Sequence, residues 1–86
     1  MWRVAFRYRP EVVETLLGHG LCPRPETDPA FVRQALSDLY RHEIRRLRDR
    51  LLRQEFPKRE YAGKVDALRR RYVLLKLPLA TWTLPD

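Results

Sequence analysis

The sequence predicts a small, mostly helical single domain over residues 1–86, with a short first helix followed by a long antiparallel helical hairpin. Three observations lead to this fold. Two long segments place apolar residues at helical spacing, a single proline separates them, and Pro10, Pro29 and Pro78 fall where helices begin or end. Both terminal segments alternate apolar and polar residues, so a two-stranded β ribbon made from the N- and C-terminal segments is a further option.

The N-terminal stretch "MWRVAFRYR" has period two, with Trp2, Val4, Phe6 and Tyr8 on one face. This alternation is typical of a short, half-buried strand. The C-terminal stretch "LPLATWTLPD" alternates more weakly and would be its partner, because a lone strand leaves its backbone groups unpaired.

The first helix is expected to start at Pro10, whose ring suits the first helical position. Glu11 and Glu14 follow in the first turns, where the helix dipole favours anions. Gly18 or Gly20 supplies the stop.

The second helix is expected to run from about Pro29 to Gln54 or Phe56, with Asp28 as its N-cap. Pro57 ends it, because a proline keeps the preceding residue out of helical geometry. Its apolar stripe consists of Phe31, Val32, Ala35, Leu36, Leu39, Tyr40, Ile44, Leu47 and Leu51.

The third helix is expected from about Lys58 to the residues before Pro78. Its apolar residues recur in steps of 4, 3, 4 and 3, a heptad-like seam formed by Tyr61, Val65, Leu68, Tyr72 and Leu75. Because the turn at Pro57 is short, the second and third helices should be antiparallel neighbours.

The charge of the chain is strongly basic and unevenly placed. Fifteen Arg and three Lys against eleven Asp and Glu give a net charge of +7. Residues 1–28 have a net charge of zero, residues 29–56 of +3 and residues 57–86 of +4. Such a balance favours anionic partners such as RNA, DNA, acidic proteins or anionic lipid headgroups. The preference for Arg and the absence of Asn are also compatible with a GC-rich genome or a thermophile.

The hairpin should bring two groups of arginines together. If it closes at Pro57, residue 57−k lies beside residue 57+k, so residues 69–71 stand level with residues 43–45. The candidate residues for binding an anion or a partner are Arg41, Arg45, Arg48, Arg69, Arg70 and Arg71. A merged basic zone of this kind is the electrostatic footprint of phosphate contacts.

A solvated helix face explains the same arginines, because acidic residues stand three or four positions from several of them. Asp38 precedes Arg41 by three positions, and Asp49 precedes Arg53 by four. Pairs at this spacing are typical of an exposed helix. The sequence also has no glycine-rich phosphate loop, RNA-stacking signature or basic-zipper pattern.

The tripeptide Leu39-Tyr40-Arg41, with the arginines that follow and Phe56, resembles the LYR-motif family. Members are small basic helical proteins that bind acyl carrier protein and serve the assembly of iron–sulfur and respiratory complexes. The resemblance covers about a third of the chain. In the family the tripeptide usually opens the first helix, whereas here it lies a turn or more into the second, and no site residues are carried over.

The residues predict no catalytic site, no metal and no cofactor. His19, Cys22 and His42 are the only soft ligands, fewer than a structural zinc site needs, and Ser37 is the only serine. With a single cysteine no intrachain disulfide forms, so a reducing compartment is expected. No apolar run approaches the roughly 18–20 residues of a membrane span, and no export signal is evident, so we expect a cytoplasmic protein.

The first functional hypothesis is a non-enzymatic interaction module. It would bind an acidic protein, form a homodimer, or serve as a subunit or assembly factor of a larger complex, since a small core gains stability from a partner. The alternative is an accessory protein that contacts RNA or DNA phosphates through the Arg-rich hairpin face. A minor alternative is an assembly factor like the LYR-motif proteins.

Overall fold

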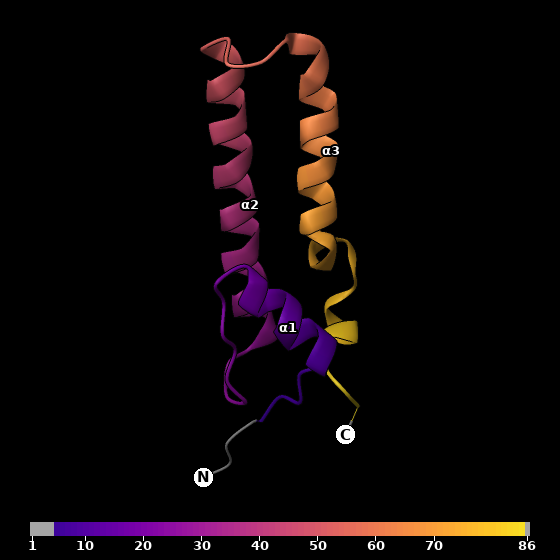
Figure 1. The fold of residues 1–86 in the computed structure, drawn as a ribbon. Coiled ribbons are helices and arrows are strands. Elements are labelled where there is room, and N and C mark those ends of the chain that lie inside the picture. Colours follow the sequence, from indigo (N-terminus) through magenta and orange to yellow (C-terminus); the bar gives the residue numbers. More distant parts are fainter. Residues whose placement is uncertain (1–4, 86) are drawn as a thin grey trace.

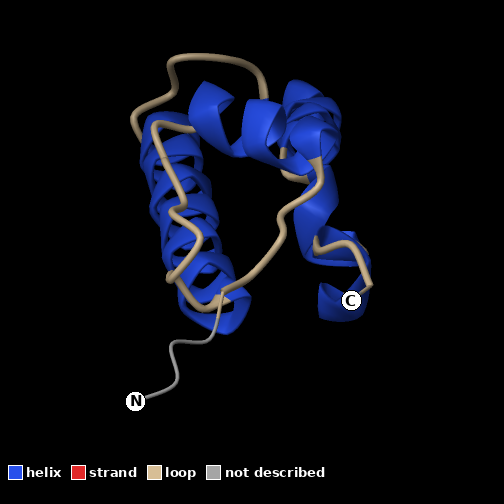
Figure 2. Ribbon diagram, turned by 90° about the horizontal axis from the view of Figure 1, so that it is seen from below, coloured by secondary structure: helices blue, strands red, loops and turns tan. Residues whose placement is uncertain are grey.

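A helical hairpin dominates the computed structural model, which describes residues 5–85. Helix α2 (Pro29–Leu52) and helix α3 (Tyr61–Arg71) run antiparallel, and the shorter α1 (Pro10–Gly18) lies across one side of the hairpin near its open end (Figure 1). Figure 2 shows the same arrangement from below. Single 3₁₀ turns precede and follow α3, at Lys58–Glu60, Val73–Lys76 and Leu79–Trp82. The mostly helical class predicted from the sequence is confirmed.

The helix starts follow from short-range signals. Asp28 Oδ1 accepts a hydrogen bond from the backbone N–H of Ala30 at 2.9 Å, and Pro29 is the first residue of α2. Pro10 likewise opens α1, where its missing N–H would have had no partner in the helix. Both predicted starts are confirmed.

Helices α1 and α2 end in the same backbone motif. After α1, the N–H of Gly20 (φ 80°) bonds to the carbonyl of Leu17 and the N–H of Leu21 to that of Leu16. After α2, the N–H of Gln54 (φ 59°) bonds to Leu51. The next N–H, that of Glu55, bonds to the Arg50 carbonyl, which completes a Schellman motif at both ends. Helix α2 therefore stops at Leu52, earlier than Pro57 alone predicts.

Helix α3 is shorter than predicted and ends at Arg71, where Tyr72 leaves the helical conformation (φ −103°, ψ 40°). The Nε2 atom of His19 lies 2.8 Å from the carbonyl oxygen of Arg71, where α3 ends. The chain then tightens into the 3₁₀ turn Val73–Lys76 before Pro78. The predicted seam still faces inward: Leu68 and Tyr72 are buried, and Leu75 packs against the core although it lies beyond the helix.

The two terminal segments meet, but no strand forms within residues 5–85. Their pairing is one antiparallel bridge between Tyr8 and Thr83, with hydrogen bonds from Arg9 N–H to Trp82 O (3.0 Å) and from Leu84 N–H to Arg7 O (2.7 Å). The predicted ribbon is limited because α1 begins directly after Arg9 and a 3₁₀ turn precedes Thr83. The rest of the predicted first strand, residues 1–4, lies outside the described residues.

The core occupies the end of the hairpin that α1 covers. It consists of Val12, Leu16, Val32, Leu36, Leu68, Tyr72, Leu74 and Trp82. Between residues 45 and 67 only the side chain of Leu47 is buried, at 8% exposure. Phe31, a member of the predicted apolar stripe, is instead open to solvent at 73% exposure, as is Leu52, which lies off the stripe.

The molecule is consequently elongated. Its radius of gyration is 15.9 Å, and its principal extents are 56 × 19 × 17 Å. A compact domain of this length would have a radius of gyration of about 12 Å. The far part of the hairpin extends away from the core as a pair of helices with no third element beside it (Figure 1).

Candidate anion-binding surface

The net charge of the protein lies on residues 41–71, the paired stretches of α2 and α3 with the turn between them, which we call the arm; its base reaches the core at Leu68. The arm holds twelve basic and five acidic residues, a net charge of +7, which is also the net charge of the whole chain. Residues 1–40 and 72–86, which we call the body, each sum to zero. The fold therefore separates a neutral, cored body from a thin, strongly cationic arm.

The two arm helices pair in the predicted register. The Nη1 atom of Arg71 lies 3.8 Å from Oε1 of Glu43, and each residue is fourteen positions from Pro57. Arg50 and Lys64 are each seven positions from Pro57, and both lie over the ring of Phe56. The rule that set residue 57−k beside 57+k therefore holds along the arm.

The three consecutive arginines of α3 nevertheless point in different directions, because successive residues of an α-helix are about 100° apart around its axis. Arg69 lines a crevice with Tyr40 and Tyr72. Arg70 donates a hydrogen bond to Asp66 of its own helix. Arg71 faces α2. The three arginines therefore lie on three different sides of α3.

The predicted arginines of α2 lie on the other side of that helix from Glu43. Arg41 is 4.0 Å from Asp38, as the i,i+3 spacing predicted. Arg45 and Arg48 are exposed, and within residues 5–85 neither makes a hydrogen bond or an ion pair. The six predicted residues are thus distributed around the arm rather than gathered on one face.

A different set of basic residues converges between α2 and α3, in a depression of about 410 Å³ that we call the basic groove. Four cations and a single carboxylate surround it, so its net charge is +3. Three small or aliphatic side chains form the rest of the lining. The lining residues are Glu43, Arg46, Leu47, Arg50, Lys64, Ala67, Leu68 and Arg71.

The carboxylate of the groove is already engaged. Glu43 accepts a hydrogen bond from the hydroxyl of Tyr72 and forms the ion pair with Arg71. Burial of the phenol, and then its hydrogen bond to Glu43, raise the pKa of Tyr72 to about 12, so the phenol keeps its proton and goes on donating to Glu43. Arg46 makes no hydrogen bond or ion pair within residues 5–85.

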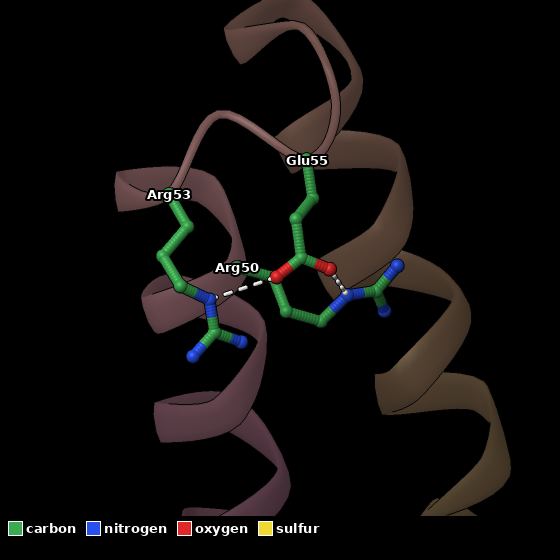
Figure 3. Close-up of polar contacts among 3 residues, drawn as sticks. All are labelled: Arg50, Arg53 and Glu55. Atoms are coloured by element: carbon green, nitrogen blue, oxygen red, sulfur yellow. Dashed lines mark hydrogen bonds and ion pairs between the residues drawn. The ribbon is translucent and has the colours of Figure 1, made fainter.

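The tip of the arm is fixed by ionic contacts around Glu55. The Nε atoms of Arg50 and Arg53 donate to its two carboxylate oxygens at 3.2 and 2.8 Å (Figure 3). The hydrogen bond from Arg53 is the largest of the causes that lower the pKa of the Glu55 carboxyl. Arg53 was expected to pair with Asp49, but the Schellman turn brings Glu55 within its reach.

Of the residues lining the basic groove, only Arg71 belongs to the predicted site. Arg46, Arg50 and Lys64 were not among the candidate residues, which were chosen by level along the hairpin and by the lack of an acidic partner rather than by direction around each helix. A sequence signal for them exists. Arg46 and Arg50 share a helix face at i,i+4, as do Lys64 and Arg71 at a spacing of seven, and the Pro57 register sets Arg50 opposite Lys64.

The soft ligands of the chain lie apart or have other contacts. His19 hydrogen-bonds to α3 and stacks on Tyr72 with ring centroids 4.3 Å apart, while Cys22 and His42 are exposed. No group of three or more His, Cys, Asp and Glu side chains with metal-binding geometry occurs within residues 5–85. In the same residues, no helix is long and apolar enough to span a membrane.

Comparison of the chain with protein-family models, curated proteins and solved structures found no match. The resemblance of Leu39-Tyr40-Arg41 to the LYR-motif family therefore stays a prediction. In the fold, Tyr40 packs edge-on against Tyr72 with ring centroids 5.2 Å apart, as an apolar contact between α2 and the core.

Proposed function

We propose that the protein is a non-enzymatic interaction module whose arm binds an anionic macromolecule. The observation that carries this proposal is the segregation of charge, with +7 on the arm and zero on the body. The arm has no acidic surface of its own large enough to neutralise this charge, so the cationic surface is available to a partner. The body would act as the folded support that holds the two helices in register.

Nucleic acid is the anionic partner that fits the arm best. The arm residues of α2 from Arg41 to Leu52 span about 17 Å of helix axis at 1.5 Å per residue. Seven net charges over this length amount to roughly one per 2–3 Å, close to the one charge per ~1.7 Å of duplex DNA. Basic side chains surround the arm, and a partner that offers phosphates in several directions can use them all.

Contact with phosphates rather than bases is the expected mode. Within residues 5–85, the one large apolar side chain of the arm that is strongly exposed is Leu52, and Phe56 is held beneath Arg50 and Lys64. The arm thus lacks the exposed aromatic platforms on which single-stranded bases stack. Binding should therefore be independent of sequence and should favour double-helical over single-stranded nucleic acid.

A matched pair of triple variants tests the proposal. In the arm variant, Arg45→Gln, Arg46→Gln and Arg48→Gln remove three charges; in the body variant, Arg7→Gln, Arg24→Gln and Lys76→Gln remove the same number from exposed sites. Binding of a mixed-sequence 20-base-pair RNA duplex is measured by fluorescence anisotropy at several salt concentrations. We expect a loss of about tenfold or more for the arm variant, and little change for the body variant.

A protein partner is the second candidate, and one surface of the body favours it. Phe31, 73% exposed, lines a crevice of about 230 Å³ with Leu21 and Cys22, between the loop that precedes α2 and the first turns of α2. An exposed aromatic beside an apolar crevice suits an acidic protein, a second copy of the chain or a subunit of a larger complex. If polyglutamate binds the arm as tightly as duplex RNA does, an acidic protein is favoured over nucleic acid as the partner.

A reducing, cytoplasmic setting fits the proposed module. Cys22 is the only cysteine and lies exposed beside Phe31, where an oxidising compartment would open it to pairing between chains.

A further inference from the structure

We propose that the basic groove between α2 and α3 is a discrete binding site for phosphate groups. The proposal rests on the proposed function of the arm and assigns its strongest contact to residues outside the set that the sequence predicted. The site would be formed by Arg46, Arg50, Lys64 and Arg71, with Leu47, Ala67 and Leu68 as its apolar floor.

The cations of the groove outnumber its carboxylates on a concave surface. Four cations line a volume of about 410 Å³ with one carboxylate, and that carboxylate already accepts the Tyr72 hydroxyl and pairs with Arg71. A depression lined by one sign of charge concentrates its field and attracts counter-ions more strongly than a convex surface does. Of the four cations, Arg50 pairs with Glu55 outside the groove and Arg71 with Glu43, whereas the side chains of Arg46 and Lys64 make no ion pair within residues 5–85.

Contacts within the protein restrict the cationic side chains of the groove and still leave them exposed to a ligand. Arg50 donates from Nε to Glu55 and lies 5.5 Å from the centroid of the Phe56 ring, and Lys64 lies 4.8 Å from the same centroid. These contacts restrict the side chains while Arg50 remains 46% and Arg71 63% exposed. Side chains that are already ordered lose less conformational entropy when a ligand binds.

The charge and composition of the groove favour phosphate over carboxylate as its ligand. A groove with a net charge of +3 is matched by a ligand that brings two or three negative charges within a few ångströms, as a phosphate dianion, a diphosphate or two adjacent phosphodiesters do. Three of the four cations are arginines, whose planar guanidinium groups bind phosphate oxygens through paired hydrogen bonds. A single carboxylate would leave most of the charge unmatched.

Neighbouring residues on the same helices provide a matched control. The groove variant Arg46→Gln/Lys64→Gln and the control variant Arg45→Gln/Arg69→Gln each remove one charge from α2 and one from α3. Arg45 is adjacent to Arg46 but about 100° away around the helix. Neither Arg45 nor Arg46 makes a hydrogen bond or ion pair within residues 5–85, so their replacement should leave the fold intact, which circular dichroism checks.

Two probes distinguish the sources of phosphate. One is the 20-base-pair RNA duplex, measured by anisotropy; the other is inorganic pyrophosphate, followed by the amide chemical shifts of Ala67 and Leu68. With backbone phosphates as the ligand, the groove variant loses at least about tenfold in duplex affinity and the control at most about threefold. With a small phosphate as the ligand, pyrophosphate shifts these amides in the wild type and in the control but not in the groove variant.

A gain of binding provides an independent variant. Glu43→Gln removes the only negative charge of the groove and keeps an oxygen that can accept from Tyr72, so affinity for the bound probe should rise about threefold or more. Equal losses in the groove and control variants, or no gain with Glu43→Gln, would overturn the groove as a discrete site and leave the proposed function of the arm standing. Failure of the wild type to bind either probe would overturn both.

Discussion

Gln54 is a single residue on which the geometry of the tip depends. Its φ of 59° lies in the left-handed region, which costs a residue with a Cβ about 1 kcal/mol relative to glycine. Gly20 occupies the equivalent position after α1, where a built Cβ would meet no atom within 4 Å. The two positions therefore have the same backbone requirement, but only one of them has glycine.

Gln54→Gly is expected to stabilise the protein by about 0.5–1 kcal/mol, since relief of the left-handed conformation outweighs the greater chain entropy of glycine in the unfolded state. Gly20→Ala should destabilise it by about 1 kcal/mol for the opposite reason. Urea denaturation followed by circular dichroism measures both. A destabilising Gln54→Gly would show that the Gln54 side chain makes a stabilising contact at the tip.

Tyr72 should give the fold a dependence on alkaline pH. Burial and the hydrogen bond to Glu43 raise its pKa from 10.0 to about 12, so the folded state favours the protonated phenol. This contribution is complete below pH 10 and is lost as the pH rises from 10 to about 12. At about 1.4 kcal/mol per tenfold change in the equilibrium, the loss is on the order of a few kcal/mol at most.

Tyr72→Phe tests this dependence, because it retains the ring and removes the titrating group. The free energy of unfolding is measured at pH 9 and at pH 11.5 for both proteins. The wild type should lose more stability between these values than Tyr72→Phe does. Equal losses would show that the interaction with Glu43 does not favour the protonated phenol.

Among the elements, α2 belongs to two environments along its length. Its first half packs into the core through Val32 and Leu36, which are 5% and 0% exposed, while its second half holds Leu47 as its one buried side chain. Local stability follows the density of buried apolar contacts. We therefore expect the arm to open without unfolding of the body.

Hydrogen exchange would show this difference within one helix. Backbone amides near Leu36 should exchange only through global unfolding, whereas amides from about Leu47 to Leu52 should exchange faster, through local opening of the arm. A polyanion that binds the arm should slow the second group and leave the first unchanged. Uniform protection along the whole of α2 would contradict a weakly held arm.

Short-range signals in the sequence predicted the elements well, and contacts between elements decided the rest. Asp28 and Pro29 mark the start of α2, and Pro57 sets the register that places Arg71 beside Glu43. The end of α3 was not predicted; at that end the carbonyl of Arg71 contacts His19, which lies 52 positions away in the chain.

In the candidate site, too, one part of the geometry follows from the sequence and another depends on contacts between elements. Level along the hairpin follows from counting residues from Pro57, and on that basis the arginines of both helices were expected together. Direction around each helix depends on which residues face the neighbouring helix, and that is set by how Leu47 and Leu68 pack. Arg46, Arg50 and Lys64 therefore require the Pro57 register to be combined with the spacing of basic residues around each helix.

At the scale of the whole molecule, shape and charge coincide. The molecule is 56 Å long and 19 × 17 Å across, and the arm carries a charge equal to the net charge of the whole chain. Like charges on a thin arm repel one another and lower its stability, so neutralisation by a bound polyanion should stabilise the fold. The melting temperature should accordingly rise on addition of duplex RNA, and it should rise less for the arm triple variant.

The central claim is that the arm, and not the body, binds phosphates, and the salt dependence of duplex binding tests it most directly. The logarithm of the association constant should fall linearly with the logarithm of salt concentration, with a slope of about −0.9 per phosphate contacted. We predict that Arg45→Gln/Arg46→Gln/Arg48→Gln reduces the slope by roughly 2–3, and that Arg7→Gln/Arg24→Gln/Lys76→Gln leaves it unchanged. Equal reductions for the two variants, or no binding by the wild type at low salt, would contradict the claim.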